Sequence, residues 1–255
     1  MTLILTHLSK YGIIHASDSN LTNDRGAAGQ AKKTFALPHL NAGMTVAGIY
    51  AVGNQPMDQW LDKFIQSHAA SNNPSLLSFA RSMKDNLEAE MLPQEKKIGS
   101  IMHIAGYVEE NGKAHPEFYH VRNVHGINDS TGEYTDIRQD FDYGEDFWSR
   151  DCPKNNLLSA FERDGYQIYI NGFPAGRMGY LAVQDMLQKF FTAVWNQPGW
   201  KFRPPKSLDE ATVFIRTYLL IINGLFEVSD YSAPLIGGPI QTHGIPRPPN
   251  ALTSC

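Results

Sequence analysis

Hydrophobic and polar positions in the first 93 residues follow two periods, which predict strands followed by helices. The apolar residues at 3–5 and 13–14 flank a turn at 9–12, and this arrangement predicts a β-hairpin. The nearly unbroken apolar run at 44–52 is typical of a strand that is covered on both faces. Apolar residues then fall at helical spacing over 57–68 and over 74–92, and Pro93 is expected to end the second helix.

The second half of the chain repeats this order around one irregular stretch. Strands are expected at 100–108 and 118–121, on either side of the hairpin turn Asn111-Gly112, and again at 166–170. Apolar stripes predict helices at 183–194 and 211–225, the second behind a capping-box start at 207–210. Residues 128–164 are acidic, turn-rich and aperiodic, so we expect an insertion or long surface loop there. A strand after 235–240 and a loosely held Pro-rich tail at 246–255 complete the chain.

The order of these elements predicts the fold class. Strands, two helices, strands, two helices and a strand suggest two stacked, mostly antiparallel sheets, each covered on its outer side by helices. No internal repeat or linker divides the chain. We therefore expect an α+β fold of the αββα sandwich type, formed by a single domain over residues 1–245 that includes the acidic insertion.

Composition and charge narrow the class of protein. A hydrophobic share of 42% and a charged share of 19% are ordinary for a soluble globular domain. The net charge of −4, without a long basic stripe, argues against nucleic acid or an anionic membrane as a partner. No apolar run approaches the roughly 20 residues of a membrane span. No signal-type segment opens the chain, so a cytoplasmic location is expected.

Metal and redox chemistry have little support in the sequence. His115, His120 and His125 lie five residues apart, so along strands they alternate between faces and are expected to be surface or packing residues. The acidic residues between 136 and 151 lack the spacing and the glycine of a calcium loop. The two cysteines, Cys152 and Cys255, cannot form a disulfide framework. No cofactor or metal is expected.

Thr2 is the strongest candidate for a reactive residue, because other polar residues follow it at fixed distances. Removal of Met1 would leave Thr2 with a free amine beside its own hydroxyl, and such an amine can take the hydroxyl proton without a separate histidine. Asp18 follows 16 positions after Thr2 (18 − 2), and Lys33 follows 31 positions after it (33 − 2). Lys33 would lower the proton affinity of the hydroxyl, Asp18 would orient Lys33, and the N–H of Gly48 would hold an oxyanion.

Each of these residues also has a plainer interpretation. Asp18 suits a turn after a strand, and most single lysines are solvated. Lys32 would replace Lys33 in the site if the register differed by one residue, because neighbours on a strand point to opposite faces. Gly48 interrupts an apolar strand, where a glycine weakens packing unless the backbone must approach another group closely.

The spacings resemble those of the proteasome β-type subunits and the bacterial proteasome-like peptidases, within the N-terminal-nucleophile hydrolase superfamily. Mature chains of that family begin with Thr, followed by an Asp 16 residues later, a Lys about 32 residues later and an oxyanion-hole Gly 46 residues later. Thr2, Asp18, Lys33 and Gly48 match this pattern, although Lys33 falls one residue short. The resemblance covers most of residues 2–126 and 166–245, and beyond the first 50 residues it rests mainly on the order of elements and on the Gly237-Gly238 pair.

This resemblance implies a four-layer αββα fold and threonine-type hydrolysis of amide bonds, most simply peptide bonds, without a cofactor. It also implies a homo-oligomer built as a ring or as stacked rings, and it leaves room for an ATPase partner. A small amide is the other substrate class left open, with residues 128–164 shaping the pocket.

The second half of the chain departs from the family. Residues 171–176 lack the serine of the turn that lies near the active threonine in the family. The late acidic and serine-containing segment is altered as well, so Asp230 or Ser232 would have to serve in its place. These departures favour the main alternative, a catalytically silent relative with an assembly or binding role.

Overall fold

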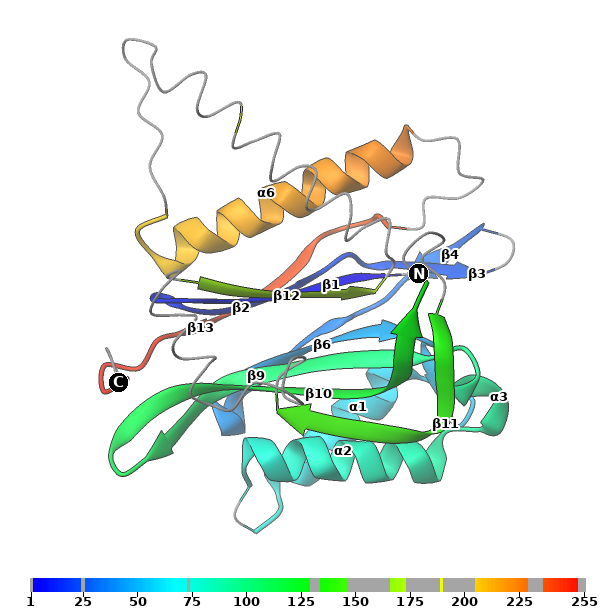
Figure 1. Cartoon of the computed structure of the whole chain (residues 1–255), viewed down its shortest axis with the longest axis horizontal. Coiled ribbons are helices and arrows are strands. Elements are labelled where there is room, and N and C mark those ends of the chain that lie inside the picture. Colours follow the sequence, from blue (N-terminus) through cyan, green and yellow to red (C-terminus); the bar gives the residue numbers. More distant parts are fainter. Residues whose placement is uncertain are drawn as a thin grey trace.

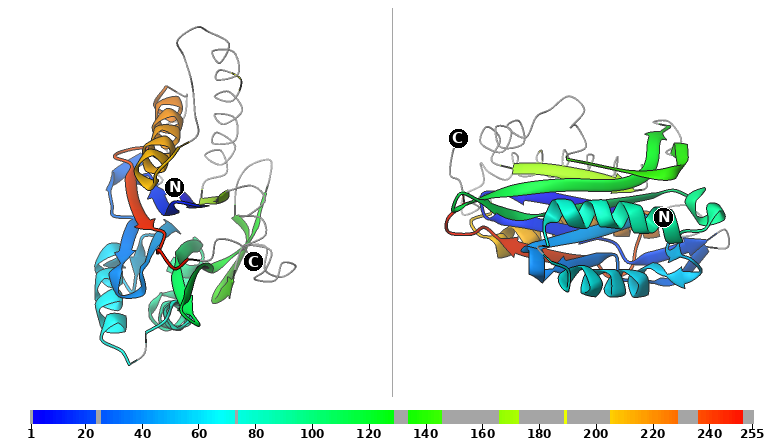
Figure 2. Two further views of the ribbon diagram at one scale, coloured as in Figure 1. Left: turned by 90° about the vertical axis from the view of Figure 1, so that its left-hand side faces the viewer. Right: turned by 90° about the horizontal axis from the view of Figure 1, so that it is seen from below.

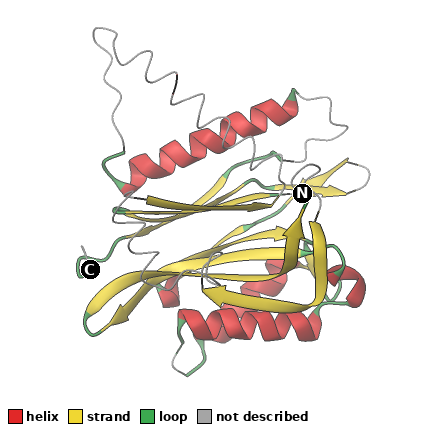
Figure 3. Ribbon diagram, viewed as in Figure 1, coloured by secondary structure: helices red, strands yellow, loops and turns green. Residues whose placement is uncertain are grey.

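The computed structural model describes residues 2–23, 26–72, 74–128, 134–145, 166–172, 189, 205–228 and 236–251. Within these ranges the chain has a mixed α+β fold with antiparallel sheets, none of which is closed (Figures 1 and 3). The predicted α+β class is confirmed at this level. Apart from residue 189, the predicted helix at 183–194 lies outside the described residues.

One sheet has four strands in the order β12-β1-β2-β13, and all neighbours are antiparallel. Its strands are β1 (Leu3–Ser9), β2 (Gly12–Ser17), β12 (Tyr166–Gly172) and β13 (Gln241–Pro246). β1 and β2 form the predicted hairpin, in which Ser9 pairs with Gly12. Both strands are buried along almost their whole length, as expected for strands with apolar partners on both faces.

The second sheet has five strands in the order β11-β10-β9-β6-β5. They are β5 (Thr34–Leu37), β6 (Ala42–Gly48), β9 (Ser100–Glu110), β10 (Lys113–Ile127) and β11 (Tyr134–Glu145). Two smaller sheets pair β3 (Asn20–Asn23) with β4 (Gly26–Gln30), and β7 (Ala51–Val52) with β8 (Gln55–Pro56). The predicted turn Asn111-Gly112 joins β9 to β10, and both residues have positive φ, 54° and 74°.

Strand β11 corrects the prediction of an insertion or surface loop at 128–164. Residues 134–145 pair with β10 at the edge of the sheet, and Phe141 is buried in the main core cluster. The pairing shifts register at Arg122/Val124, Val124/Gly126 and Gly126/Ile127. Among the described strands, β11 pairs with β10 only, and its register against that strand shifts. Apolar and polar residues therefore do not alternate regularly along it, and this alternation is the pattern by which a strand is recognised in a sequence.

The helices of the described ranges are the 3₁₀-helix η1 (Pro38–Leu40) and the α-helices α1 (Met57–Ala69), α2 (Leu76–Glu90), α3 (Pro93–Lys96) and α6 (Leu208–Glu227). Helices α1, α2 and α6 agree with the predicted segments, whereas the short η1 and α3 were not predicted. Pro93 follows α2 as expected and also begins the short α3. None of these described helices combines the length and apolar character needed to cross a bilayer.

The start of α6 differs in detail from the predicted capping box. Ser207 is the N-cap, and its hydroxyl accepts a hydrogen bond from the N–H of Glu210 at 3.1 Å. The Glu210 carboxylate, however, accepts from the N–H of Lys206 at 2.9 Å, one residue before the N-cap. One N–H of the helix end is therefore satisfied by the Ser207 side chain, and the reciprocal bond of a capping box is replaced by a bond to the residue before the N-cap.

Figures 1 and 2 show α1 and α2 against the five-stranded sheet and α6 against the four-stranded sheet. Three sets of apolar contacts hold these elements together. Helices α1 and α2 pack on the five-stranded sheet through a cluster that includes Trp60, Phe79, Met83 and Ile104. Helix α6 packs on the four-stranded sheet, where Ile215 and Leu219 share a cluster with residues of β1 and β2. The two sheets contact each other through two further clusters: one contains Leu8, Ile13, Ala105, Tyr107, Phe118, Tyr169 and Ile245, and the other contains Ile4, Ala47, Ile101 and Val124.

The described part of the Pro-rich tail is held in place, contrary to the prediction of a loosely held segment. The N–H of Arg247 donates to the carbonyl of Tyr11 at 3.1 Å, in the β1–β2 turn. Ala251 is buried and forms an isolated bridge with Ala114, next to the β9–β10 turn. These two contacts join the tail to both hairpins, and sequence composition alone gives no sign of such long-range partners.

Candidate functional site

Thr2 immediately precedes β1, and the alternation of side chains along that strand fixes the direction in which Thr2 points. Leu3 and Leu5 face α6, as members of the cluster formed with that helix. Ile4 faces the other way, in a cluster with residues of β6, β9 and β10, and Thr6 contacts His103 of β9 at 3.2 Å. Because alternate residues of a strand share a face, the Thr2 side chain belongs to the row that faces the five-stranded sheet. It is only 5% exposed.

The position of Thr2 along this row is close to the end of β6. Thr6 contacts His103, whose partner on β6 is Thr45, and two residues earlier Ile4 shares a cluster with Ala47. Residues nearer the start of β1 therefore lie opposite residues nearer the end of β6. The same progression, two residues of β6 for every two of β1, brings Thr2 to the end of β6, where Gly48 is the last strand residue and Ile49 follows.

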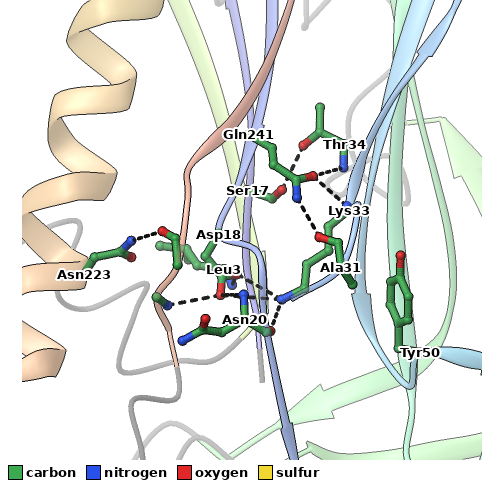
Figure 4. A network of polar contacts seen from close by, with 12 residues as sticks. Leu3, Ser17, Asp18, Asn20, Ala31, Lys33, Thr34, Tyr50, Asn223 and Gln241 are labelled. Carbon is green, nitrogen blue, oxygen red and sulfur yellow. Dashed lines mark hydrogen bonds and ion pairs between the residues drawn. The ribbon is translucent and has the colours of Figure 1, made fainter. Parts of the chain in front are cut away.

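Asp18 and Lys33 form a buried ion pair beside the first residues of β1 (Figure 4). The ammonium Nζ of Lys33 lies 3.3 Å from Asp18 Oδ1 and 3.5 Å from Oδ2, and it also donates to the carbonyl of Asn20. The Lys33 and Asp18 side chains are 1% and 0% exposed. Asp18 Oδ1 also accepts from the N–H of Leu3 at 3.0 Å, so the pair is joined directly to the residue that follows Thr2.

Two further backbone donors complete the surroundings of the Asp18 carboxylate. Its Oδ2 accepts from the N–H of Asn20 at 3.2 Å and from the N–H of Gly237 at 3.3 Å. The following Gly238 carbonyl accepts from the side chain of Asn223, a buried residue of α6, at 3.0 Å. The glycine pair noted in the sequence is therefore part of the site. Asn223 gave no sequence signal, because a single Asn within an apolar helix has no recognisable motif.

Burial shifts the pKa of both charged groups of the pair. Desolvation lowers the pKa of the Lys33 amine, and the nearby Asp18 carboxylate opposes this effect. Desolvation likewise raises the pKa of Asp18, against the effects of Lys33 and of the N–H donors from Leu3 and Gly237. Groups whose pKa is shifted by burial and by a charged partner concentrate at functional sites.

The structure decides between Lys32 and Lys33. The Lys33 side chain points inward to Asp18, whereas that of Lys32 is 50% exposed and pairs with Asp62 of α1 at 3.1 Å. The plainer interpretation, a solvated lysine, therefore applies to Lys32.

Gly48 is the last residue of β6, and its N–H points to the edge of β6 that faces the Lys33 backbone. The N–H of Val46 donates to the carbonyl of Lys33 at 3.0 Å, and the N–H of Ile49 donates to Gly99 on the opposite edge, also at 3.0 Å. Because N–H groups alternate along an extended strand, the N–H of Gly48 shares the direction of Val46. The glycine itself has another explanation: its φ is +109°, and a Cβ would lie 2.1 Å from the carbonyl oxygen of Gly99.

Gly172, the last residue of β12, lies against the Thr2 backbone. It pairs with Leu3, has a φ of +106°, and a Cβ there would lie 1.9 Å from the carbonyl oxygen of Thr2. Asn171 turns its side chain between the sheets, where its amide nitrogen lies 2.7 Å from His103 Nε2. Asp230, the remaining predicted site residue, and Ser232 lie outside the described residues.

We predict that Gly172→Ala displaces the start of β1, because the added methyl group would overlap the Thr2 carbonyl. Amide hydrogen exchange should show faster exchange at the N–H of Leu3, which donates to Asp18. Gly112→Ala is the matched control, since Gly112 also has a positive φ, +74°, but no atom lies within 4 Å of the added Cβ. This control should cost only the conformational term of about 1–2 kcal/mol. Equal exchange at Leu3 in the two variants would contradict the close approach.

A chain of polar side chains crosses the interface between the two sheets. Thr6 Oγ1 lies 3.1 Å from His15 Nδ1 and 3.2 Å from His103 Nδ1. His15 Nε2 lies 3.3 Å from the carbonyl of Ala105, and His103 Nε2 lies 2.7 Å from the amide nitrogen of Asn171. All four side chains are buried.

The partners of this chain determine where its protons lie. The carbonyl of Ala105 can only accept, so His15 carries its proton on Nε2 and accepts from the Thr6 hydroxyl at Nδ1. Thr6 then accepts from Nδ1–H of His103, which leaves Nε2 of His103 to accept from Asn171. Burial lowers the pKa of both imidazoles and so favours their neutral forms, and in these forms the two rings take opposite tautomers.

The three histidines considered as metal ligands do not converge. His120 is buried between the sheets, and desolvation lowers its pKa to about 4. His115 lies 3.3 Å from the Glu117 carboxylate, and His125 is partly buried. Across the described ranges, no three His, Cys, Asp or Glu side chains come together in a way that could hold a metal ion.

No protein-family profile matches the chain, and no curated protein sequence matches it significantly. The described contacts join a buried ammonium–carboxylate pair to the N–H of Leu3, the residue after Thr2. A hydroxyl, an ammonium and a backbone N–H are the kinds of group that nucleophilic catalysis uses.

Proposed function

We propose that this chain is a proteasome-like N-terminal threonine hydrolase that cleaves amide bonds, most simply peptide bonds, after removal of Met1. The observation that carries the proposal is the buried Asp18–Lys33 pair attached to the N–H of Leu3, next to Thr2. A buried ion pair gives little net stability compared with apolar residues of similar volume, so stability is a weak reason for its presence. A site that must hold a positive charge near a hydroxyl supplies a stronger reason.

The proposal includes the four-layer αββα arrangement that the helix and sheet contacts favour. It also includes a cytoplasmic homo-oligomer built as a ring or stacked rings, with room for an ATPase partner, as the family resemblance implies. The apolar contacts of α6 with one sheet, and of α1 and α2 with the other, support this layering.

In the proposed reaction, Thr2 Oγ1 attacks the carbonyl carbon of the substrate amide while the free α-amine of Thr2 takes the hydroxyl proton. Lys33 lowers the proton affinity of the hydroxyl, and the N–H of Gly48 donates to the oxyanion that forms on the carbonyl oxygen. The protonated α-amine of Thr2 then gives its proton to the leaving nitrogen, the C–N bond breaks, and an ester to Thr2 remains. Water, deprotonated by the same amine, hydrolyses the ester and restores the hydroxyl.

A catalytically silent subunit is the second candidate. The observation that favours it is the absence of a serine in residues 171–176, together with the use of the Asn171 side chain as a partner of His103. Under this alternative, the ion pair would only shape the start of β1. A hydrolase of small amides is a third candidate, and cleavage of peptide libraries compared with simple amides and penicillin-type compounds separates it from a peptidase.

The test is the intact mass of the purified protein before and after an electrophile that reacts with N-terminal threonine. We expect a chain that lacks Met1 and gains one adduct. Thr2→Ala should abolish the adduct, because the hydroxyl is the attacking group, while its stability should change little. Thr6→Ser, which keeps a hydroxyl on the same face of β1, is the control and should be labelled like the wild type.

Two results would count against an active enzyme. A chain that retains Met1 has no free threonine amine, and a chain that loses Met1 without taking the adduct has no activated hydroxyl. Either result would favour the silent subunit. An adduct that persists in Thr2→Ala would place the nucleophile elsewhere.

A further inference from the structure

One side chain of the four-stranded sheet, that of Gln241, forms three hydrogen bonds with the backbone at the start of β5. Residues 31–33 connect β4 to β5 and belong to neither strand. The amide oxygen of Gln241 accepts from the N–H of Lys33 at 2.7 Å and from the N–H of Thr34 at 3.1 Å, and its amide nitrogen donates to the carbonyl of Ala31 at 2.6 Å (Figure 4). The glutamine amide thus takes the place of a peptide group from a neighbouring strand.

A second contact at the same level strengthens this attachment. Gln241 is the first residue of β13 and pairs with Ser17 of β2. The Ser17 hydroxyl lies 2.8 Å from the hydroxyl of Thr34. On its other edge, the Lys33 carbonyl accepts from the N–H of Val46 at 3.0 Å. The Lys33 backbone is therefore held from both sides, by β6 through its carbonyl and by Gln241 through its N–H.

The Lys33 side chain depends on this placement. Its ammonium reaches Asp18 at 3.3 Å, and both residues are almost fully buried, so the side chain has little freedom to compensate for a backbone shift. Burial lowers the pKa of Lys33 while the Asp18 charge raises it, so any change in their separation alters the charge presented to Thr2.

We propose that Gln241 is a positioning residue that fixes the location of the Lys33 ammonium relative to Thr2. This inference rests on the proposed function, because its consequence is the reactivity of the Thr2 hydroxyl. Gln241 acts through the Lys33 backbone and need not contact the substrate. No motif marks it in the sequence, since its three partners lie 207–210 residues away.

The experiment measures the rate of Thr2 labelling by the N-terminal-threonine electrophile as a function of pH, together with thermal unfolding. Gln241→Met keeps the length of the side chain and removes all three hydrogen bonds. We expect labelling to slow about tenfold or more, which corresponds to about 1.4 kcal/mol. The acid limb of the pH profile should move to higher pH, because a displaced ammonium no longer lowers the proton affinities of the Thr2 amine and hydroxyl.

Three comparisons make the result decisive. Gln241→Glu retains an acceptor for both N–H groups but loses the donor to the Ala31 carbonyl, so it should recover only part of the rate. Gln30→Met, at an exposed glutamine of β4, should behave like the wild type. If Gln241→Met fails to fold, Gln241→Asn, whose shorter side chain cannot reach all three partners, should show the same change of rate and pH profile.

The possible failures can be told apart. A wild-type protein that takes no adduct would reject the proposed function. A labelled wild type with an unchanged rate and pH profile in the Gln241 variants would reject the positioning role alone. A loss of thermal stability with unchanged labelling would make Gln241 a purely structural residue and would overturn the inference.

Discussion

Replacing Asp18 with Asn should lower the free energy of unfolding by about 3–5 kcal/mol, because it leaves the Lys33 ammonium buried without a counter-charge. The Lys33 side chain is 1% exposed, so water cannot take over the role of the lost carboxylate. The same substitution weakens the acceptor for the N–H groups of Leu3, Asn20 and Gly237. The start of β1 should therefore loosen, and urea denaturation at neutral pH measures the loss.

The double variant Asp18→Asn/Lys33→Met separates the charge from the packing. It removes the uncompensated ammonium and fills much of the same volume with an apolar chain, so most of the lost stability should return. Labelling of Thr2 should nevertheless be lost in this variant, because the positive charge beside the hydroxyl is gone. A stable protein without reactivity is the pattern expected of a pair that is retained for chemistry.

Lys32→Met is the matched control for the Lys33 substitution. Lys32 pairs with Asp62 at the surface, where the two side chains are 50% and 53% exposed. Such pairs contribute about 0–1 kcal/mol, so the control should be nearly neutral in stability and in labelling. An equally small effect of Asp18→Asn would mean that water or structural relaxation compensates Lys33, contrary to its observed burial.

Acidification should destabilise the protein from about pH 6.5 downward, through histidines that are buried in the neutral form. Desolvation lowers the pKa of His15 to about 3 and holds that of His103 well below its usual range. In the unfolded chain these groups titrate near 6.5, so below that pH the unfolded state binds more protons and is favoured. Each such histidine should cost about 1.4 kcal/mol per pH unit until its folded pKa is reached.

The slope of unfolding free energy against pH between 5 and 7 counts these protons directly. His15→Asn keeps an acceptor for the Thr6 hydroxyl and removes one titrating group, so the slope should fall by about one proton. Thr6→Val is the control: it leaves His103 Nδ1–H without its acceptor and should lower stability by about 1–3 kcal/mol at every pH. Its slope should match that of the wild type, and an unchanged slope in His15→Asn would mean that His15 titrates normally in the folded protein.

Much of the local structure could be predicted from the sequence because it depends on neighbouring residues. The two hairpin turns, the helices α1 and α2 and the Ser207 cap all follow from periods and turn residues that span a few positions. The spacing of Thr2, Asp18 and Lys33 also predicted a site at the chain start, and the structure joins Lys33 to Asp18, and Asp18 to Leu3.

The rest depended on partners that are distant in the sequence. Strand β11 was missed because its pairing with β10 is irregular and it lies at the edge of the sheet. The choice of Lys33 over Lys32 depended on the register of β5 against β6, which the neighbouring residues do not specify. Gln241, Asn223 and the Thr6–His15–His103 chain acquire their roles only when strands from both ends of the chain meet.

The sequence by itself determined most of the strands and the longer described helices, although not β11, and it placed a hydroxyl, a carboxylate and an ammonium at intervals typical of a single site. The tertiary structure alone decided which lysine is buried, which glutamine holds its backbone and which histidines stay neutral between the sheets. The physical reason is that local periodicity reports only which face of an element is buried, whereas hydrogen bonds and charges depend on the groups that the other sheet brings opposite that face.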